Sequence, residues 1–192
     1  MNVELIDITA GAENLIAECA RTCYQSEAKT AEANVKLLER LRDMGHLSTF
    51  EHAKVTFRIS GISRACSHQL VRHRHFSFSQ MSQRYVDEKD FAYVTPPAVE
   101  EKVEAKRIFD AQVASARKAY EALVAAGLNK EDARFVLPNA AETEIIVTAN
   151  FRSLREFIKL RTTPAAQWEI RDLAQEMLRI LKDKAPHAFG DL

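Results

Sequence analysis

Residues Arg72–Ser82, with the sequence RHRHFSFSQMS, place two arginines and two histidines beside two phenylalanines, three serines and a glutamine. The stretch contains no acidic residue. Guanidinium groups bind anionic oxygens in pairs and stack on flat rings, so this composition favours a ligand that offers both. Because the pattern from Leu70 to Tyr85 has neither helical nor strand periodicity, we expect an ordered loop there.

The segments on either side of this loop predict regular structure. Val55–Ile59 alternate apolar and polar residues, which indicates a half-buried strand that ends at Gly61. Ile62–Leu70 return to helical spacing, and Glu144–Asn150 form a second apolar run typical of a strand. Further helices are predicted at Ala12–Tyr24, at Thr30–Met44 with Thr30 as N-cap, at Val99–Ala126, between Asn129 and Pro138, at Ser153–Leu160 and at Ala165–Lys184.

The helix at Ser153 is expected to begin with a capping box formed by Ser153 and Glu156. Helices therefore dominate, and the strands are few and separated. This pattern predicts an α+β fold, a helix-rich single domain over residues 1–192 with a small antiparallel or mixed sheet.

Overall composition limits the possible partners. The chain has 192 residues, 27 basic and 27 acidic, so its formal net charge is zero. Bulk charge therefore gives no support for general binding to nucleic acid or to a membrane surface. No apolar run reaches the roughly 20 residues of a membrane span, and three cysteines without paired spacing suit a reducing compartment. We expect a cytoplasmic protein.

Local charge is uneven. No Asp or Glu occurs from His52 to Val86, while the basic residues there are mostly arginine. A solvated basic face would explain this, as would a zinc site built from the histidines or a surface for single-stranded nucleic acid with Phe76 and Phe78 as stacking platforms. The histidine spacing follows no usual zinc pattern, and acids are frequent elsewhere. A phosphorylated, ring-bearing small molecule fits best.

Several segments resemble the flavin-dependent thymidylate synthases. Arg72-His73-Arg74, seven residues and then Ser82 are similar to that family's RHR-x7-S motif. The resemblance occurs in family order and covers roughly residues 20 to 190. It extends to QRY at Gln83–Tyr85, GHLSTFEH at Gly45–His52, DARFVLP at Asp132–Pro138, NFRSL at Asn150–Leu154 and the segment Leu160–Ile170.

The resemblance implies reductive methylation of dUMP to dTMP. Methylenetetrahydrofolate would donate the carbon, reduced FAD the hydride, and NADPH would re-reduce the flavin. It also implies a homotetramer with active sites at subunit interfaces, and neither a nucleic acid partner, nor a membrane, nor a metal.

By the same resemblance, residues can be assigned to each ligand. The residues implied for FAD are Ser48, Arg72, His73, Arg74, Gln80, Asn150 and Arg152, with His46 and Glu51 nearby. The residues implied for dUMP are Gln69, Arg72, Gln80, Ser82, Gln83, Arg84, Arg134 and Arg161. Arg161 is implied as the catalytic residue, because a fixed guanidinium facing the uracil ring can stabilise developing negative charge.

The sequence departs from the family pattern at three places. Gln80 stands where many members have an acid, Glu156 where members often have Asn or His, and Thr162–Ala165 lack a histidine found in some members. Ser82 has no adjacent general base, so a positioning hydrogen bond is favoured over a nucleophilic role. A nucleotide- or flavin-binding module without turnover remains an alternative, because fold does not guarantee function.

Overall fold

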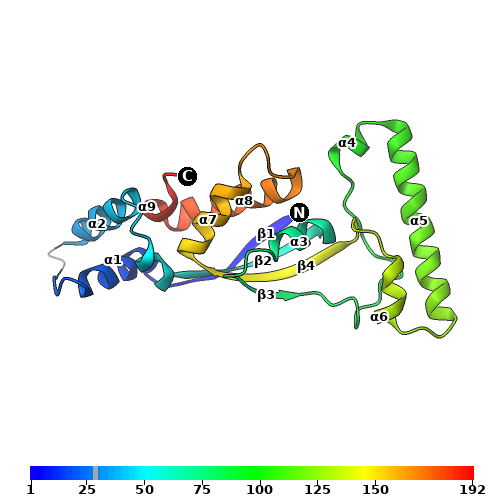
Figure 1. The fold of residues 1–192 in the computed structure, drawn as a ribbon, viewed down its shortest axis with the longest axis horizontal. Helices are drawn as coiled ribbons and strands as arrows, with labels where there is room; N and C mark the ends of the chain where they lie inside the picture. Colours follow the sequence, from blue (N-terminus) through cyan, green and yellow to red (C-terminus); the bar gives the residue numbers. More distant parts are fainter. Residues whose placement is uncertain (28–29) are drawn as a thin grey trace. The chain divides into compact units, whose positions relative to one another are not determined.

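The computed structural model describes residues 1–27 and 30–192. It has an α+β architecture in which helices accompany a four-stranded antiparallel sheet of order β1-β2-β4-β3 (Figure 1). The strands are β1 Asn2–Ile8, β2 Lys54–Ser63, β3 Ser77–Gln80 and β4 Glu142–Asn150. The predicted α+β class, rich in helix and with a small sheet, is confirmed.

The chain divides into two compact units. Unit one comprises Met1–Ile59, Gln69–Phe78 and Ile146–Leu192, and unit two comprises Ser60–His68 and Ser79–Ile145. The strands β2 and β4 each contribute residues to both units.

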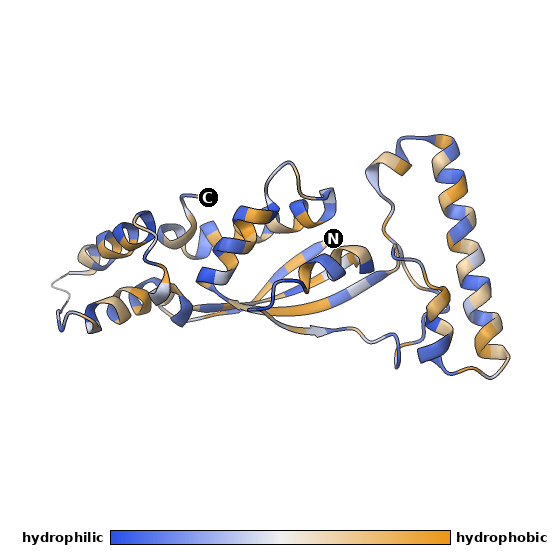
Figure 2. Cartoon of the chain, in the orientation of Figure 1, coloured by the Kyte–Doolittle hydropathy of each residue, from blue (hydrophilic) through white to orange (hydrophobic). Residues whose placement is uncertain are grey.

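Unit one contains most of the helices. They are α1 Ala12–Thr22, α2 Ala31–Asp43, the 3₁₀ helix η1 Ser48–His52, α7 Phe151–Arg161, α8 Trp168–Lys184 and α9 Pro186–Phe189. Within this unit α1 packs on α2, α7 on α8, and α8 contacts β1. In Figure 2, α7 and α8 carry both hydrophobic and hydrophilic residues, as helices with one buried face do.

The core of unit one follows from two periodicities. On β2, Val55, Phe57 and Ile59 are buried while the residues between them are not, which is the period of two of a half-buried strand. On the helices the buried positions recur every three or four residues. They are Phe151, Leu154, Phe157 and Ile158 on α7, and Ile170, Leu173, Ala174, Met177 and Leu181 on α8.

Unit two has its own helices and a separate small core. Its elements include the first part of α3 Arg64–Leu70, α4 Pro97–Glu100, α5 Val103–Ala125, α6 Lys130–Ala133 and the 3₁₀ helix η2 Arg134–Val136. Buried Phe91, Val113, Ala116 and Ala141 form one cluster. Arg117 on α5 packs against this cluster. Its guanidinium lies 5.2 Å from the Phe91 ring centre and donates to the Phe91 carbonyl at 2.7 Å.

Some boundaries differ from those predicted. Thr30 is the N-cap of α2, with its hydroxyl accepting from the Ala33 amide at 3.2 Å, as expected. The strands β1 and β3 have no counterpart among the predicted elements, so the expected loop at 70–85 contains a short strand. The helix expected at Val99–Ala126 is two helices, α4 and α5, separated at residues 101 and 102.

The predicted capping box at Ser153 is wrong. The N-cap of α7 is Asn150, whose side-chain oxygen accepts from the Ser153 amide at 2.8 Å. Ser153 and Glu156 therefore lie inside the helix. Asn150, three residues upstream, supplies the acceptor instead. As the last residue of β4 it already has the extended backbone that an N-cap requires.

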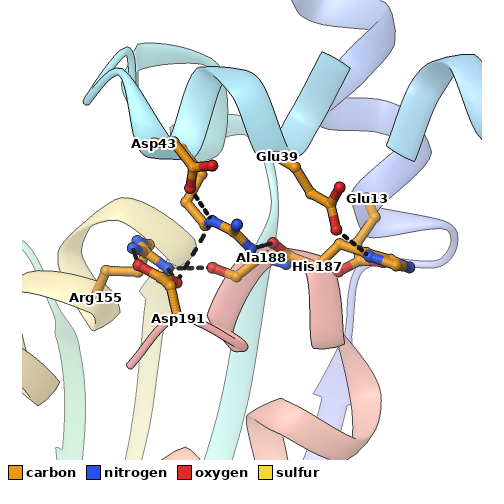
Figure 3. Close-up of polar contacts among 8 residues, drawn as sticks. Glu13, Glu39, Asp43, Arg155, His187, Ala188 and Asp191 are labelled. Atoms are coloured by element: carbon orange, nitrogen blue, oxygen red, sulfur yellow. Dashed lines mark hydrogen bonds and ion pairs between the residues drawn. The ribbon is translucent and has the colours of Figure 1, made fainter. Parts of the chain in front are cut away.

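Polar contacts join the residues after α8 to three helices, α1, α2 and α7 (Figure 3). Arg155 of α7, only 1% exposed, forms a two-bond ion pair with Asp191 at 2.5 and 2.7 Å and also donates to the Ala188 carbonyl. Arg42 of α2 donates to the His187 carbonyl at 2.7 Å. Arg155 is thus a buried structural residue, and we call the Arg155–Asp191 pair the α7 anchor.

Candidate functional site

A cavity of about 590 Å³ opens in unit one, within the size range of small-molecule sites. Four segments of chain line it: η1, the loop after α3, the end of β4 and the first turns of α7. The lining residues are Glu51, His73, Arg74, His75, Phe76, Asn150, Arg152, Ser153 and Glu156. The arginine-histidine motif and the asparagine-arginine motif, far apart in sequence, are therefore brought together.

The α7 side of the cavity is set by the junction with β4. Asn150 is both the last residue of β4 and the N-cap of α7, so strand and helix join without a connecting loop. Residues three or four apart share one side of a helix, and Arg152 and Glu156 are spaced in this way. The first two turns of α7 consequently present a cation, a hydroxyl and a carboxylate to the cavity.

Arg152 is already oriented by an acid. Its guanidinium lies 2.6 Å from the Glu51 carboxylate of η1, and both side chains are about half exposed at 48%. A pair this open to solvent contributes little to stability. Its consequence is geometric, because Glu51 fixes where the Arg152 fork points while leaving further N–H donors for a ligand.

His73 contacts the last residue of α7. The Arg161 Nε–H donates to His73 Nε2 at 3.1 Å. The His73 ring also lies edge-on to Phe157 at 4.9 Å and tilted to Phe76 at 5.6 Å, measured between ring centres. Burial, and secondarily the charge of Arg161, hold the pKa of His73 below its ordinary value of 6.5.

The cavity lining suits a ligand that combines anionic and aromatic groups. Arg74 and Arg152 offer charge-assisted donors, and the Phe76 ring and the imidazoles offer flat surfaces. Glu156 makes no hydrogen bond or ion pair with the described residues and can accept from hydroxyl or amide donors. These donors, acceptors and flat surfaces fit the phosphates, ribityl hydroxyls and ring edge of a flavin dinucleotide.

Besides Arg161, which contacts His73, four predicted residues of unit one lie outside this lining: His46, Ser48, Gln69 and Arg72. His46, Ser48 and Arg72 are exposed, and Gln69 is half-buried. The sequence did not predict four lining residues: His75, Phe76, Ser153 and Glu156. His75 and Phe76 directly follow the arginine-histidine motif, and that adjacency was the available signal.

The remaining predicted residues belong to unit two and make local contacts there. Gln80 donates its amide to the hydroxyls of Ser67 and Thr143 at 2.9 and 3.1 Å. Arg84 pairs with Glu131 at 2.8 Å, and Arg134 donates to the Glu131 carbonyl at 3.0 Å. The structure therefore brings Arg84 and Arg134 to the same residue of α6.

A buried acid, Glu88, and a half-buried arginine, Arg64, lie in the same unit as these residues. Burial raises the pKa of Glu88, which is 3% exposed, while the charge of Arg64 opposes that rise. Burial lowers the pKa of Arg64, and the charge of Arg134 lowers it further, against the charge of Glu88. Neither Arg64 nor Glu88 was assigned to a site from sequence, because a lone buried carboxylate leaves no spacing signature.

Residues 1–27 and 30–192 contain no group of three or more His, Cys, Asp or Glu side chains placed to hold a metal ion. None of their helices is both long and apolar enough to cross a bilayer.

Comparison with known proteins identifies the family. The model of the thymidylate synthase complementing protein family matches residues 4–187. A flavin-dependent thymidylate synthase of Geobacter sulfurreducens is 47% identical over 200 residues, covering 100% of this chain and 86% of the relative. Relatives of the same name from Mycolicibacterium vanbaalenii and Mycobacterium tuberculosis are 44% identical over 94% of this chain and 80% of theirs. The chain therefore belongs to the thymidylate synthase complementing protein family.

Proposed function

We propose that this chain is an FAD-dependent thymidylate synthase. It converts dUMP to dTMP, with methylenetetrahydrofolate as carbon donor and NADPH as the final reductant. The observation that carries the proposal is the cavity of unit one, where His73 and Arg74 of one family motif meet Asn150 and Arg152 of another. Relatives over nearly the full chain have the name flavin-dependent thymidylate synthase, which supports the same activity.

The cavity is proposed as the flavin site. Arg74 and Arg152 would hold the cofactor's phosphates, His73 its ring edge, and the amide nitrogen of Asn150 would remain free to donate, because its oxygen caps α7. Bound FAD would supply the hydride chemistry, and the chain supplies binding, orientation and charge. Ser48, Arg72 and Gln80 are retained as proposed flavin contacts on the family resemblance alone.

The nucleotide residues are proposed in two groups. Ser82, Gln83, Arg84 and Arg134 of unit two would bind dUMP, the two arginines through its phosphate. Arg84 would exchange its half-exposed partner Glu131 for a dianion, which is the stronger acceptor. Gln69, Arg72 and Gln80 complete the proposed set, and Arg161 is proposed to act on the reacting ring.

The assembly and location are also part of this proposal. We infer one domain spanning residues 1–192, because a single family model covers residues 4–187. Two further inferences are a homotetramer with sites at its interfaces, from the family resemblance, and a cytoplasmic location. Three free cysteines support the latter.

The purified protein is expected to bind FAD and to be yellow. With dUMP, methylenetetrahydrofolate and NADPH it should form dTMP, and its gene should rescue a thymidine-requiring bacterial strain. Absorbance near the flavin bands, product chromatography and growth without thymidine measure these three properties. Flavin binding without dTMP would instead identify a binding module that lacks turnover, and a protein that takes up no FAD would contradict the cofactor assignment.

Arg152→Gln is expected to weaken FAD binding by about 10- to 100-fold, because a charge-assisted hydrogen bond contributes about 1.5–3 kcal/mol. Glu51→Gln should weaken FAD binding by only a few fold. This change removes the carboxylate that orients Arg152 but leaves the arginine itself in place. Fluorescence titration of the apoprotein with FAD measures both. Arg179→Gln on the exposed side of α8 is the control. If Arg152→Gln and Arg179→Gln bind FAD with equal affinity, Arg152 does not contribute to the FAD site.

A further inference from the structure

The hydrogen bond between Arg161 and His73 defines the protonation state of the histidine. An arginine nitrogen has no acceptor function, so the Nε–H of Arg161 is the donor and His73 Nε2 must present a lone pair. The imidazole is therefore neutral with its proton on Nδ1. A doubly protonated ring could not accept this bond.

Packing holds both partners in place. The His73 ring lies against Phe76 of its own loop and Phe157 of α7, which are 7% and 0% exposed. Phe157 and Arg161 are four residues apart on α7, so they share one side of the helix. One face of α7 thus supplies both the Phe157 ring that packs against His73 and the Arg161 guanidinium that donates to it.

Electrostatics favour the same state. Burial disfavours the imidazolium, and Arg161 adds a like charge at hydrogen-bond distance, so the pKa of His73 is lowered. No hydrogen bond or ion pair joins His73 to a carboxylate in the described part of the chain. The titratable and charged groups around it are Arg161 on α7 and, around the cavity, Arg74, His75, Glu51, Arg152 and Glu156.

We propose that His73 is a positioning residue for Arg161: its neutral ring fixes the direction of the guanidinium and leaves the four terminal N–H groups for the reacting ligand. This rests on the proposed function for the identity of that ligand. It also follows that His73 offers a bound cofactor its Nδ1–H as a donor, so the atom it meets must be an acceptor such as a carbonyl or phosphate oxygen.

The proposal predicts a pH effect with a definite sign. As pH falls through the lowered pKa of His73, the ring gains a proton, loses its acceptor and places a second cation beside Arg161. The guanidinium is then released, so kcat falls on the acid side. His73→Gln keeps an acceptor oxygen and does not titrate, so this acid limb should be absent from that variant.

The direct test measures the tautomer and the pKa of His73. In protein labelled with ¹⁵N-histidine, we expect the His73 resonances of the Nδ1–H tautomer and a pKa below 6.5. Arg161→Gln should raise that pKa, whereas Lys159→Gln, which removes a charge from an exposed position of the same helix, should leave it in place. An Nε2–H tautomer, or one pKa shared by wild type and Arg161→Gln, would overturn the proposal.

The kinetic test separates positioning from cofactor binding. His73→Phe keeps the ring packing and removes the acceptor, so kcat should fall by about 10- to 100-fold while KM for dUMP changes by a few fold. His73→Gln should recover most of kcat. Loss of FAD affinity with an unchanged kcat at saturating FAD would overturn the positioning role. If the wild-type protein forms no dTMP, the proposed function fails. The tautomer measurement then still shows whether Arg161 donates to His73.

Discussion

Replacing Arg161 with alanine should lower dTMP formation by about 100-fold or more while dUMP still binds. A preorganised cation facing developing negative charge contributes on the order of 3 kcal/mol to transition-state stabilisation. Arg161 suits this role because α7 ends at this residue, His73 orients it, and its side chain remains only half-buried. Steady-state rates with saturating dUMP and calorimetric titration of dUMP measure the two quantities.

The control for this experiment comes from the same helix. Lys159→Ala removes a cation two residues away from an exposed position, and its rate should stay within about twofold of wild type. If Arg161→Ala turns over as fast as Lys159→Ala, Arg161 has no part in the chemistry. If dUMP binding is lost together with turnover, the guanidinium acts in the ground state instead.

Asp191→Asn is expected to destabilise the fold by about 2–3 kcal/mol, a large effect for a residue outside the regular elements. The change leaves the Arg155 cation buried without its anion, and breaking a buried pair costs about 3–5 kcal/mol. The cost is reduced here because the Asp191 side chain is 32% exposed. For a chain of this size the midpoint of thermal unfolding should fall by about 5–10 °C, measured by circular dichroism.

An exposed ion pair of similar length provides the comparison. Glu176 and Arg179 on α8 lie 2.7 Å apart, but Arg179 is 69% exposed, so Glu176→Gln should change stability by less than about 0.5 kcal/mol. Equal effects of the two substitutions would show that burial of Arg155 does not determine the energetics of the α7 anchor.

The effect of Asp191→Asn should also depend on pH. Burial alone would raise the pKa of Asp191, but the hydrogen bond and charge of Arg155, together with Arg42, lower it overall from 3.8. A lowered carboxyl pKa stabilises the fold above the unfolded value and loses this contribution as pH falls through the folded one. Wild type and Asp191→Asn should therefore differ fully above about pH 5. In urea titrations the difference should shrink as the pH falls below 3.8 and disappear only below the lowered pKa of the folded state.

Sequence periodicity predicted elements whose buried face is long and regular. The alternation at Val55–Ile59 and the helical spacing of α8 both survive in the structure because burial repeats along the element. The strand β1 was missed because acids interrupt its pattern and Ile6 is exposed on it. The strand β3 was missed because two of its four residues are serines, and four residues are too few to establish an alternating pattern.

The site was partly predictable for a different reason. Motif resemblance placed His73, Arg74, Asn150 and Arg152 together, and the cavity brings all four to one surface. The anchor of Arg155 could not be found in this way. It depends on a partner 36 residues later in the chain, and no local pattern signals such a pairing.

The direct junction of β4 and α7 has a thermodynamic consequence for ligand binding. With no loop between strand and helix, Asn150, Arg152 and Ser153 have backbone angles that are fixed before any ligand arrives. A ligand that orders a loop on binding loses affinity to the entropy of that loop. At the β4–α7 wall of the cavity that loss is confined to side-chain rotamers, so ligand binding should change backbone hydrogen exchange little at residues 146–156.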